Sequence, residues 1–578
     1  MDSGGGQEVG GGQEAATDLD RAAALVASQQ FGAAETLVRA ALAQPSRRGA
    51  ARVLLARIFQ EQGRSDDAQN ELRTAVQDEP TYTEAWLGWA ALLQAYGHAQ
   101  RAEDCLRLAL THLPRSPEVH NDLGLVLLAQ GKLAEAQSAL TQAVSLAPRQ
   151  AAYRCNLGLV RGRVGDSAGA ALAFREAIAL NPALPEAHNG LGAVLKARDP
   201  EAATAALRTA LDLRPGYAEA LDNLGVLAVF ARRLDEATRL FDEALAANPR
   251  YLRALGHKTT ALFLARRLPE AWQAYRRRFE VEGLKHDPHG RFPQPVWHGE
   301  SLQNKAILVW TELGLGEEIL QAGMLSDLAR IAARITVECS PRLETLFRRS
   351  FPDLTIIPRT NPARACPVAV DAEVQIAGGD LGGLLRAAPE KFTPHRGYLK
   401  ADPVRAAALR QRYAAAGTYV IGLSWASHRS ALGKDKTLAL ADFVPLLNVP
   451  GVVFVTLQYG ADPAEIAEMQ KNSGVSLFTD PEVDFAGDMD GVAAQVAAMD
   501  LVISVSNTTV HLAGALNIPV WNIVPAHNAT GLWHWFADSD TSPWYPAMRI
   551  YRRTEPTPAK LIETIAADLR ARVAGGVR

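Results

Sequence analysis

Prolines at nearly constant intervals constrain the first half of this chain more than any other feature of its sequence. Successive prolines lie 35, 34, 34, 34, 33 and 34 residues apart, at Pro45, Pro80, Pro114, Pro148, Pro182, Pro215 and Pro249. A fixed period of this length is typical of a solenoid, in which one supersecondary unit is repeated and stacked. The sequence therefore predicts a repeat array over residues 17–280.

Small and large apolar residues keep a fixed register with these prolines. Alanines lie twelve and five residues before each proline, and a leucine or phenylalanine follows the first alanine by four residues; Ala33, Leu37 and Ala40 begin the series. The preceding helix carries a Leu-Gly pair, with glycines at Gly88, Gly124, Gly158, Gly192 and Gly225. Small residues let two helices approach closely, so we expect about seven helix-turn-helix units and a capping helix within 266–280.

These registers together resemble the tetratricopeptide repeat. The resemblance implies a curved groove that binds a peptide or protein segment, so we expect the array to hold a protein partner. Four asparagines are predicted to face this groove and to bind the acceptor, in a partial version of the asparagine ladder of O-GlcNAc transferases: Asn121, Asn156, Asn189 and Asn223. The alternative is that they are solvated polar positions on an exposed helix face.

Charge and composition exclude some classes of function. The formal net charge is −3 and 48% of the residues are apolar, which gives no basic surface for nucleic acid or an anionic membrane. The Gly-rich, acidic residues 1–16 are expected to be a disordered tail. They lack the pattern of a signal peptide, and no later stretch approaches the length of a membrane span. We therefore expect a cytoplasmic protein that neither spans a membrane nor binds nucleic acid.

Cysteines and histidines give no metal signature. The four cysteines, Cys105, Cys155, Cys339 and Cys366, show no paired spacing. A turn-rich linker at 281–303 contains His286, His289 and His298, but it has no ligand motif, so a packed or solvated loop is the preferred interpretation. We predict no metal and no cofactor.

Beyond this linker, strand-length apolar segments alternate with helical ones. The segments are 305–310, 333–339 and 354–358 in the first half, and 418–425, 451–458, 501–505 and 519–524 in the second half, which ends with a helix over 558–574. This order predicts two Rossmann-like α/β halves, 304–415 and 416–578, in the GT-B architecture. Such sheets bind ligands at the carboxyl ends of their strands, so the loops there are the candidate sites.

The first candidate loop joins strand 305–310 to a helix. Gly314 and Gly316 form its turn and are predicted to contact the donor, and Glu317 and Glu318 open the helix. Carboxylates are favoured at a helix N-terminus by the helix dipole, so both can be ordinary terminal residues. The alternative is that Glu317 faces the cleft as a general base that removes a proton from an acceptor hydroxyl.

The second candidate loop follows strand 501–505. It carries Ser506, Asn507, Thr508 and Thr509, and His511 lies one turn into the helix. Backbone N–H groups and hydroxyls at a helix N-terminus form an anion site, where the phosphates of a donor can bind and His511 can stabilise the leaving nucleotide. The alternative is that Ser506 merely caps a core helix.

Several blocks between 290 and 574 resemble bacterial tetratricopeptide-repeat glycosyltransferases related to the heptosyltransferases of lipopolysaccharide synthesis. The matching blocks are FPQPVWHG, LVWTELGLGEEI, IGLSWAS, FVTLQYG, HLAGALNIPVW and TSPWYPAMRIYRR. The resemblance implies that Glu317 is the catalytic carboxylate and that His511 is retained. Ser506 and Asn507 stand where that family has the Asp-Thr pair that binds donor phosphates.

The same resemblance implies further donor contacts. Ser424, Trp425 and Ser427, with Lys434 and Lys436 after them, match a second strand end that contacts phosphate. Gln458 and Tyr459 are expected to wall the nucleotide pocket. Trp544 and Tyr545 either stack on a base or sugar or belong to the core between the halves.

The order of repeats and α/β halves is similar to that of the flagellin-modifying glycosyltransferases of bacteria. It implies transfer of a sugar, such as a nonulosonic acid of the pseudaminic type, from a nucleotide-activated donor to Ser or Thr of a protein held by the repeats. Flagellin is the leading acceptor. Two alternatives are a transferase that acts on lipopolysaccharide or another glycan, and a non-catalytic scaffold with a decayed transferase domain.

Overall fold

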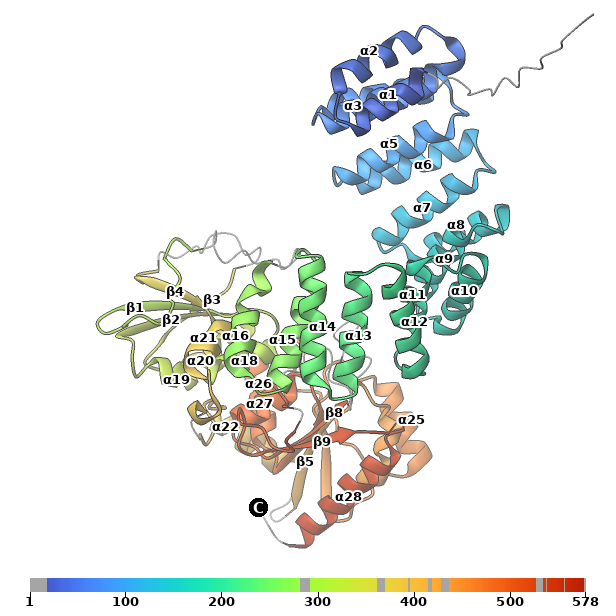
Figure 1. Cartoon of the computed structure of the whole chain (residues 1–578). Helices are drawn as coiled ribbons and strands as arrows, with labels where there is room; N and C mark the ends of the chain where they lie inside the picture. The colour runs from blue at the N-terminus through green and yellow to red at the C-terminus, as the bar shows by residue number, and fades with distance from the viewer. Residues whose placement is uncertain are drawn as a thin grey trace, which may run out of the picture. The chain divides into compact units, whose positions relative to one another are not determined.

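The computed structural model describes residues 18–280, 292–360, 370–392, 395–413, 418–427, 436–525, 534–536, 538–555 and 557–575 (Figure 1). The backbone divides into two compact units, Met1–Pro215 and Gly216–Arg578. Several predictions lie outside the described residues: the tail 1–16, Lys434, Cys366, His286 and His289.

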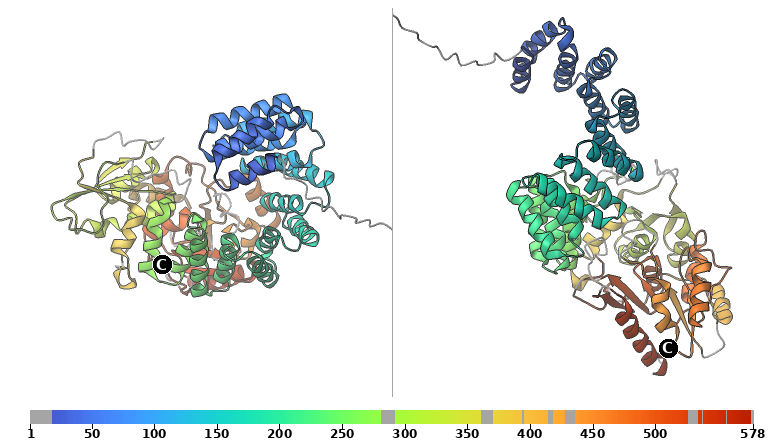
Figure 2. Two further views of the ribbon diagram at one scale, coloured as in Figure 1. Left: turned by 45° about the horizontal axis from the view of Figure 1, so that its top comes forward. Right: turned by 90° about the vertical axis from the view of Figure 1, so that its right-hand side faces the viewer.

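The first unit is a stack of helix pairs, which Figure 2 shows from two sides. Its described helices are α1 (Asp18–Ala27), α2 (Phe31–Ala41), η1 (Pro45–Arg47), α3 (Arg48–Glu61), α4 (Ser65–Asp78), α5 (Thr83–Ala95), α6 (Ala99–His112), α7 (Pro117–Ala129), α8 (Leu133–Leu146), α9 (Ala151–Val164), α10 (Ser167–Leu180), α11 (Pro185–Leu195) and α12 (Pro200–Leu213). The predicted helical solenoid is confirmed.

From Gly124 to Gly225, the glycine of each Leu-Gly pair meets the large apolar residue of its own repeat as the register predicts, whereas Gly88 meets Leu72 of the preceding repeat. A Cβ atom added to Gly158 would come within 2.8 Å of the Phe174 ring, and one added to Gly225 within 2.4 Å of Phe241. The missing side chain therefore makes the space that the neighbouring helix fills. From the second repeat on, the alanines in register with each proline are buried at the helix contact.

The first repeat corrects the register by one residue. Ala33 and Ala40 are exposed, whereas Ala34, Val38 and Ala41 are buried. The cause is the 35-residue interval from Pro45 to Pro80: Pro45 lies one residue early, so counting back from it selects the wrong helix face.

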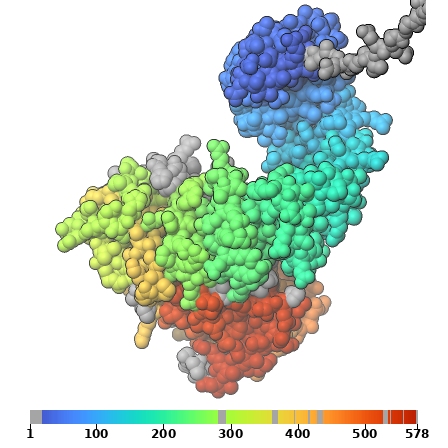
Figure 3. All heavy atoms as spheres, in the orientation of Figure 1, coloured from blue at the N-terminus to red at the C-terminus, as the bar shows by residue number. Residues whose placement is uncertain are grey.

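The second unit begins with four more helices of the array: α13 (Ala218–Phe230), α14 (Leu234–Ala247), α15 (Leu252–Leu264) and α16 (Leu268–Arg276), followed by the turn η2 (Arg277–Glu280). The last repeat shares one hydrophobic core with the first α/β half, since Phe263 and Trp272 cluster with Ile307 and Val309. The space-filling view shows the same close packing of this repeat on that half (Figure 3).

The first α/β half contains a four-stranded parallel sheet in the order β3-β2-β1-β4. Its elements are β1 (Ala306–Trp310), α18 (Leu315–Ala322), α19 (Leu325–Leu328), β2 (Arg334–Cys339), η3 (Pro341–Leu343), α20 (Glu344–Ser350), β3 (Thr355–Pro358), β4 (Val374–Ala377), η4 (Gly378–Asp380), α21 (Leu381–Leu385) and η5 (Pro389–Lys391). Residues 292–303 of the expected linker pack on it, because Phe292, Trp297 and Leu302 are buried.

The second half contains a five-stranded parallel sheet in the order β6-β5-β7-β8-β9. Its elements are α22 (Pro403–Tyr413), β5 (Tyr419–Ser424), η6 (Leu440–Phe443), α24 (Val444–Leu447), β6 (Val452–Thr456), α25 (Pro463–Ser473), α26 (Met489–Ala497), β7 (Leu501–Val505), α27 (Thr508–Ala515), β8 (Val520–Pro525), β9 (Met548–Arg553) and α28 (Ala559–Ala574). The two parallel sheets agree with the predicted pair of Rossmann-like halves.

Every strand predicted from the sequence is present, and two further strands among the described residues were missed. The missed strands are β4 and β9, which lie at one edge of each sheet. No helix in the described part of the chain is long and apolar enough to cross a membrane.

Candidate active site at the strand ends

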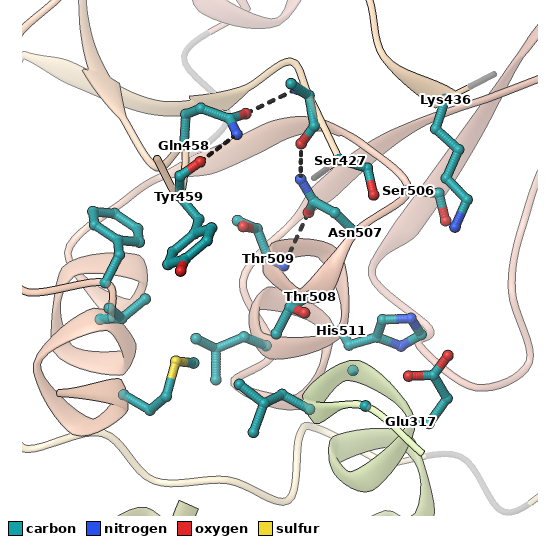
Figure 4. Close-up of a pocket in the computed structure, with 18 of the residues that line it drawn as sticks. Glu317, Ser427, Lys436, Gln458, Tyr459, Ser506, Asn507, Thr508, Thr509 and His511 are labelled. Atoms are coloured by element: carbon teal, nitrogen blue, oxygen red, sulfur yellow. Dashed lines mark hydrogen bonds between the residues drawn. The ribbon is translucent and has the colours of Figure 1, made fainter. Parts of the chain in front are cut away.

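A cavity of about 430 Å³ lies where strand ends of the two sheets meet (Figure 4). It is lined by residues that follow β1 (Gly314–Glu317), β2 (Arg342), β5 (Ala426 and Ser427), β6 (Gln458 and Tyr459) and β7 (Ser506–Thr509), together with Lys436 and His511. In the second sheet β5 lies between β6 and β7, so chain order reverses there. Parallel sheets bind ligands at such a reversal, and the size suits a small-molecule ligand.

The two predicted loops meet at this cavity. Glu317 opens α18 in the first half, and His511 lies in α27 of the second half; both line the same wall. In Figure 4 the Glu317 carboxylate lies beside the His511 ring, with the Lys436 ammonium on the other side of that ring. The sequence placed these residues in separate loops, and the fold brings them together.

Glu317 and its neighbour Glu318 have different surroundings. Glu317 is half-buried and lines the cavity. Glu318 is 2% exposed, and its carboxylate accepts hydrogen bonds from Thr311 Oγ1 at 2.6 Å, from the backbone N–H of Ser340 at 2.8 Å and from Arg359 Nη2 at 2.9 Å. Glu318 therefore serves the fold, and Glu317 is the carboxylate that a ligand can reach.

His511 is buried in a cluster of aromatic rings. Its Nδ1 lies 3.0 Å from the Tyr545 hydroxyl, and its ring stacks on Trp535 at 5.3 Å. Burial, with a smaller contribution from the charge of Lys436, lowers the pKa of His511 to about 3. The imidazole is therefore neutral near pH 7. When the Tyr545 hydroxyl donates to Nδ1, the ring proton is on Nε2.

Gly316 makes room for this ring. A Cβ atom at residue 316 would come within 2.9 Å of His511 Cδ2 and 3.5 Å of Nε2. Gly314 is the N-cap of α18, and Leu313 before it has a φ of 69°, which is unusual for a residue with a side chain. The two glycines therefore have separate roles: Gly314 ends the turn and Gly316 lets α18 approach α27.

Asn507, and not Ser506, caps α27. The Asn507 Oδ1 accepts from the backbone N–H of Thr509 at 3.0 Å, and its Nδ2 donates to Ser424 Oγ at 2.8 Å. Ser506 Oγ accepts from Trp535 Nε1 at 2.6 Å. The alternative that Ser506 is the helix cap is therefore wrong: its hydroxyl is engaged by an indole of the surrounding wall.

Gln458 holds the neighbouring strand end. Its Oε1 accepts from the backbone N–H groups of Trp425 at 3.0 Å and Ala426 at 2.8 Å and from Ser424 Oγ at 3.0 Å, and its Nε2 donates to the Tyr459 carbonyl. The side-chain oxygen of Gln458 therefore accepts its hydrogen bonds from the protein and not from a ligand. Gln458 and Asn507 thus connect β5, β6 and β7 in one network, which fixes the shape of the cavity wall.

The predicted donor contacts of Ser424 and Trp425 are wrong, because neither residue lines the cavity. Ser424 is 0% exposed and lies behind the wall, within the Gln458–Asn507 network. Trp425 is 2% exposed, and its indole packs in the hydrophobic core of the second half. Neither side chain lines the cavity, because Ser424 bonds to Gln458 and Asn507 and the Trp425 ring is part of the core. Ser427, further along the loop, does line it.

The opposite end of the cavity is more apolar. Tyr459 is 52% exposed there, and Phe485, Met489 and Val492 contribute to the lining. Figure 4 places Tyr459 away from Glu317 and Lys436. The cavity therefore has a charged end beside His511 and an aromatic end that suits a planar ring.

Arg342 is a lining residue that the sequence analysis missed. It follows β2, and its Nη2 donates to the Phe485 carbonyl at 2.6 Å. The only sequence feature that could have indicated Arg342 is its position as a cation after a predicted strand. This feature is weak, because the residues after β2 form no recognisable motif.

Trp544 and Tyr545 belong to the core between the halves. Both are buried and neither lines the cavity. The Trp544 ring meets Phe392 edge-on at 4.8 Å, and a Cβ atom at Gly514 would come within 2.4 Å of the Tyr545 ring. The interdomain-core alternative is therefore confirmed, and Tyr545 reaches the site only through its hydroxyl bond to His511.

Two of the predicted asparagines of the array bond to each other. Asn156 Nδ2 donates to Asn121 Oδ1 at 2.8 Å, and Asn121 Nδ2 donates to Asp122 Oδ1 at 3.0 Å. Asn156 and Asn189 are partly exposed, whereas Asn121 and Asn223 are buried, and Asn223 lies in the second unit. Asn121 and Asn156 thus bond to each other across successive repeats, and acceptor binding by the four asparagines stays a prediction.

Comparison with known protein families identifies the array. A model described as tetratricopeptide repeat matches residues 25–92 and 61–123, and a second model of that description matches residues 121–185, 155–218 and 223–278.

Solved structures that the chain resembles have low overall similarity to it. The Cut9–Hcn1 hetero-tetramer of the APC/C matches with a TM-score of 0.36 and 18% identity, over 42% of this chain and 48% of that one. YrrB, described as a TPR protein with an unusual peptide-binding site, matches with a TM-score of 0.26 and 20% identity, over 32% of this chain and 95% of that one. The pilF protein of Pseudomonas aeruginosa matches with a TM-score of 0.32 and 23% identity, over 36% of this chain and 96% of that one.

One curated relative is similar beyond chance. Protein FlbA of Caulobacter vibrioides is 33% identical over 296 residues, which are 48% of this chain and 48% of FlbA. The chain therefore spans about half the length of the curated relative it matches. It carries an N-terminal array of tetratricopeptide repeats, and FlbA is a distant homologue of it.

Proposed function

We propose that residues 304–578 form a glycosyltransferase that moves a sugar from a nucleotide-activated donor to a Ser or Thr hydroxyl of a protein held by the repeats. The observation that carries the proposal is one cavity in which the Glu317 carboxylate lies beside His511, Lys436 and the N-terminus of α27. A group that accepts a proton and groups that bind an anion are the two parts that sugar transfer to a hydroxyl needs.

Glu317 acts as the general base. As the acceptor hydroxyl oxygen forms its bond to the anomeric carbon of the donor, its proton passes to a carboxylate oxygen of Glu317. The bond between the anomeric carbon and the phosphate oxygen breaks, and the electron pair leaves with the nucleotide. Glu318 cannot take this role because its carboxylate is enclosed by Thr311, Ser340 and Arg359.

The departing phosphate binds at the N-terminus of α27. Thr508 and Thr509 begin this helix and line the cavity, and the positive end of the helix dipole favours an anion there. The Lys436 ammonium balances charge on the leaving group. A neutral His511 donates one hydrogen bond from Nε2, which stabilises the leaving group without a change in the charge of the ring.

The nucleoside occupies the aromatic end. Tyr459 exposes half of its surface there and offers a face on which a base can stack. The donor sugar then lies between the base end and Glu317. A nonulosonic acid, which carries a carboxylate, is the proposed sugar, and Arg342 and Lys436 are cationic side chains among the described lining residues.

The repeats supply the acceptor, and flagellin is the leading candidate. Tetratricopeptide repeats are protein-binding modules, and the name of the distant homologue FlbA suggests a flagellum-related role. We place the reaction in the cytoplasm, where nucleotide-activated sugars and newly made flagellin are both present.

The test is intact-mass analysis of purified flagellin after incubation with the full chain and a panel of nucleotide-activated sugars. The expected result is a mass increase of one or more sugar residues with the wild-type chain, and a product yield lower by at least about 100-fold in the same time with Glu317→Gln. A pull-down with the full chain accompanies it, because the last repeat shares its core with the first α/β half. If no protein partner is retained and a glycan gains mass instead of flagellin, the acceptor is lipopolysaccharide or a related glycan.

A further inference from the structure

The last helix of the repeat array packs against a glycine-rich segment of the first α/β half. Gly378, Gly379, Gly382 and Gly383 follow β4 and form η4 and the start of α21. A Cβ atom at Gly382 would come within 2.0 Å of the Trp272 ring, and one at Gly379 within 3.0 Å of Tyr275. These glycines therefore make the space into which α16 packs.

Arg278, in the turn η2 after α16, lies between two carboxylates at this junction, and its side chain is 10% exposed. Its guanidinium pairs with Glu312, with Nε at 3.2 Å from Glu312 Oε2, and its Nη1 lies 2.5 Å from Asp380 Oδ1. Nη1 also donates to the Tyr275 carbonyl at 3.0 Å, and the guanidinium lies 4.1 Å from the centre of the Tyr275 ring. One cation of the array thus holds together residues that follow β1 and β4.

Glu312 belongs to the loop that carries the proposed base. The loop runs from the end of β1 at Trp310, through Thr311 and Glu312, to Gly314 and α18. Thr311 is fixed by its bonds to Glu318 and to the Glu338 carbonyl. The next residue, Glu312, is held by its ion pair with Arg278. Leu313 follows it and has a positive φ before α18 begins. A positive φ costs free energy for a residue with a side chain, so surrounding contacts must stabilise it.

We propose that Arg278 is a positioning residue for Glu317, which makes the C-terminal cap of the repeat array a structural part of the transferase site. This inference rests on the proposed function for the role of Glu317. The planar guanidinium of Arg278 pairs with both Glu312 and Asp380. Because its positive charge neutralises the Glu312 carboxylate, Glu312 can stay buried instead of turning toward solvent. The β1–α18 loop is then held at the geometry that points Glu317 into the cavity.

The test compares Arg278 with Arg277, the residue before it in η2. Among the described residues Arg277 pairs with Glu280 at an exposed position, so Arg277→Met is the matched control. Arg278→Met is combined with Glu312→Gln and Asp380→Asn, so that no buried charge is left alone. Arg278→Lys is the second variant, because a lysine keeps the charge but cannot bond both carboxylates through a planar fork.

Amide hydrogen exchange over 311–322 in the full chain gives a reading that does not depend on activity. We expect faster exchange of this segment, by about tenfold, in both Arg278 variants and not in Arg277→Met. The turnover number should fall by about 10- to 100-fold, while the dissociation constant for the nucleotide stays the same, since only the base is displaced.

Wild-type exchange and turnover in both Arg278 variants would overturn the proposal, as would an equal change in Arg277→Met. If the triple variant does not fold, Arg278→Lys decides by the same two readings. If the wild-type chain transfers no sugar, the proposed function fails, and the exchange rates still show whether Arg278 fixes the loop.

Discussion

The repeat array and the cavity wall place their contacting residues at very different distances along the chain. In the array, Gly158 packs on Phe174, only sixteen residues later, and the same contact recurs in the neighbouring repeats. In the wall, Asn507 bonds Ser424 across 83 residues, and His511 lies against Gly316, from the other half. A local, repeated contact can be changed in one repeat while the others remain. A change in the wall disturbs several strand ends at once.

The largest effect we predict is the difference between substitutions of two adjacent carboxylates, Glu317 and Glu318. Glu317→Gln should lower the turnover number about 10²- to 10⁴-fold, because the proposed general base is lost, with little change in thermal stability. Glu318→Gln should destabilise the second unit by about 3 kcal/mol, because Arg359 loses its buried anion. Sugar transfer and calorimetric unfolding of both variants check this. Equal turnover in the two variants would remove Glu317 from the reaction.

His511 gives the second prediction, which concerns acid stability. Its folded pKa is about 3, below the ordinary value of 6.5, because burial disfavours the imidazolium. Between these values the unfolded chain binds a proton that the folded chain does not. The stability contributed by the neutral ring is therefore complete above pH 6.5 and is lost as the pH falls below that value.

Asparagine at this position keeps a hydrogen-bond donor and does not titrate. From pH 7 to pH 5 the wild type should lose about 2 kcal/mol more unfolding free energy than His511→Asn. Urea unfolding of the second unit at the two pH values measures it. An equal loss in both proteins would mean that His511 is not buried as a neutral ring.

The smallest effect we predict lies in the array. Gly158→Ala should destabilise the first unit by at least about 1 kcal/mol, because the added methyl group meets the Phe174 ring. Gly32→Ala is the control: it lies in α2 with no atom within 4 Å of the added methyl group, and alanine favours a helix by about 0.5 to 1 kcal/mol. Calorimetry of the two variants should show opposite shifts. A stabilising Gly158→Ala would contradict the packing rule of the repeats.

This difference in contact distance explains what the sequence could and could not predict. The helix pairs followed from the period, and the one error, at Ala33 and Ala40, arose where the proline interval was 35 residues. The central strands were recognised because they are continuous apolar runs. The strands β4 and β9 were missed because they are short or carry charged residues, as in MRIYRR.

In the site, the sequence identified the loops but not the direction of each side chain. Glu317, Thr508, Thr509, His511 and Lys436 line the cavity, whereas Trp425 and Ser424 lie behind its wall. A motif shows which residues follow a strand, but not whether a side chain faces the ligand or bonds within the wall, as Ser424 does with Gln458 and Asn507. The Arg278 junction was missed because its partners, Glu312 and Asp380, follow different strands and carry no motif.

Titration calorimetry with CMP, UDP, GDP and ADP tests most directly the central claim that this cavity holds a nucleotide in front of Glu317. We predict that the full-length wild type binds at least one of them, that Glu317→Gln binds it equally well, and that His511→Ala binds it about tenfold or more weakly. If none of the four nucleotides binds, or if His511→Ala binds as tightly as the wild type, the proposed site is contradicted.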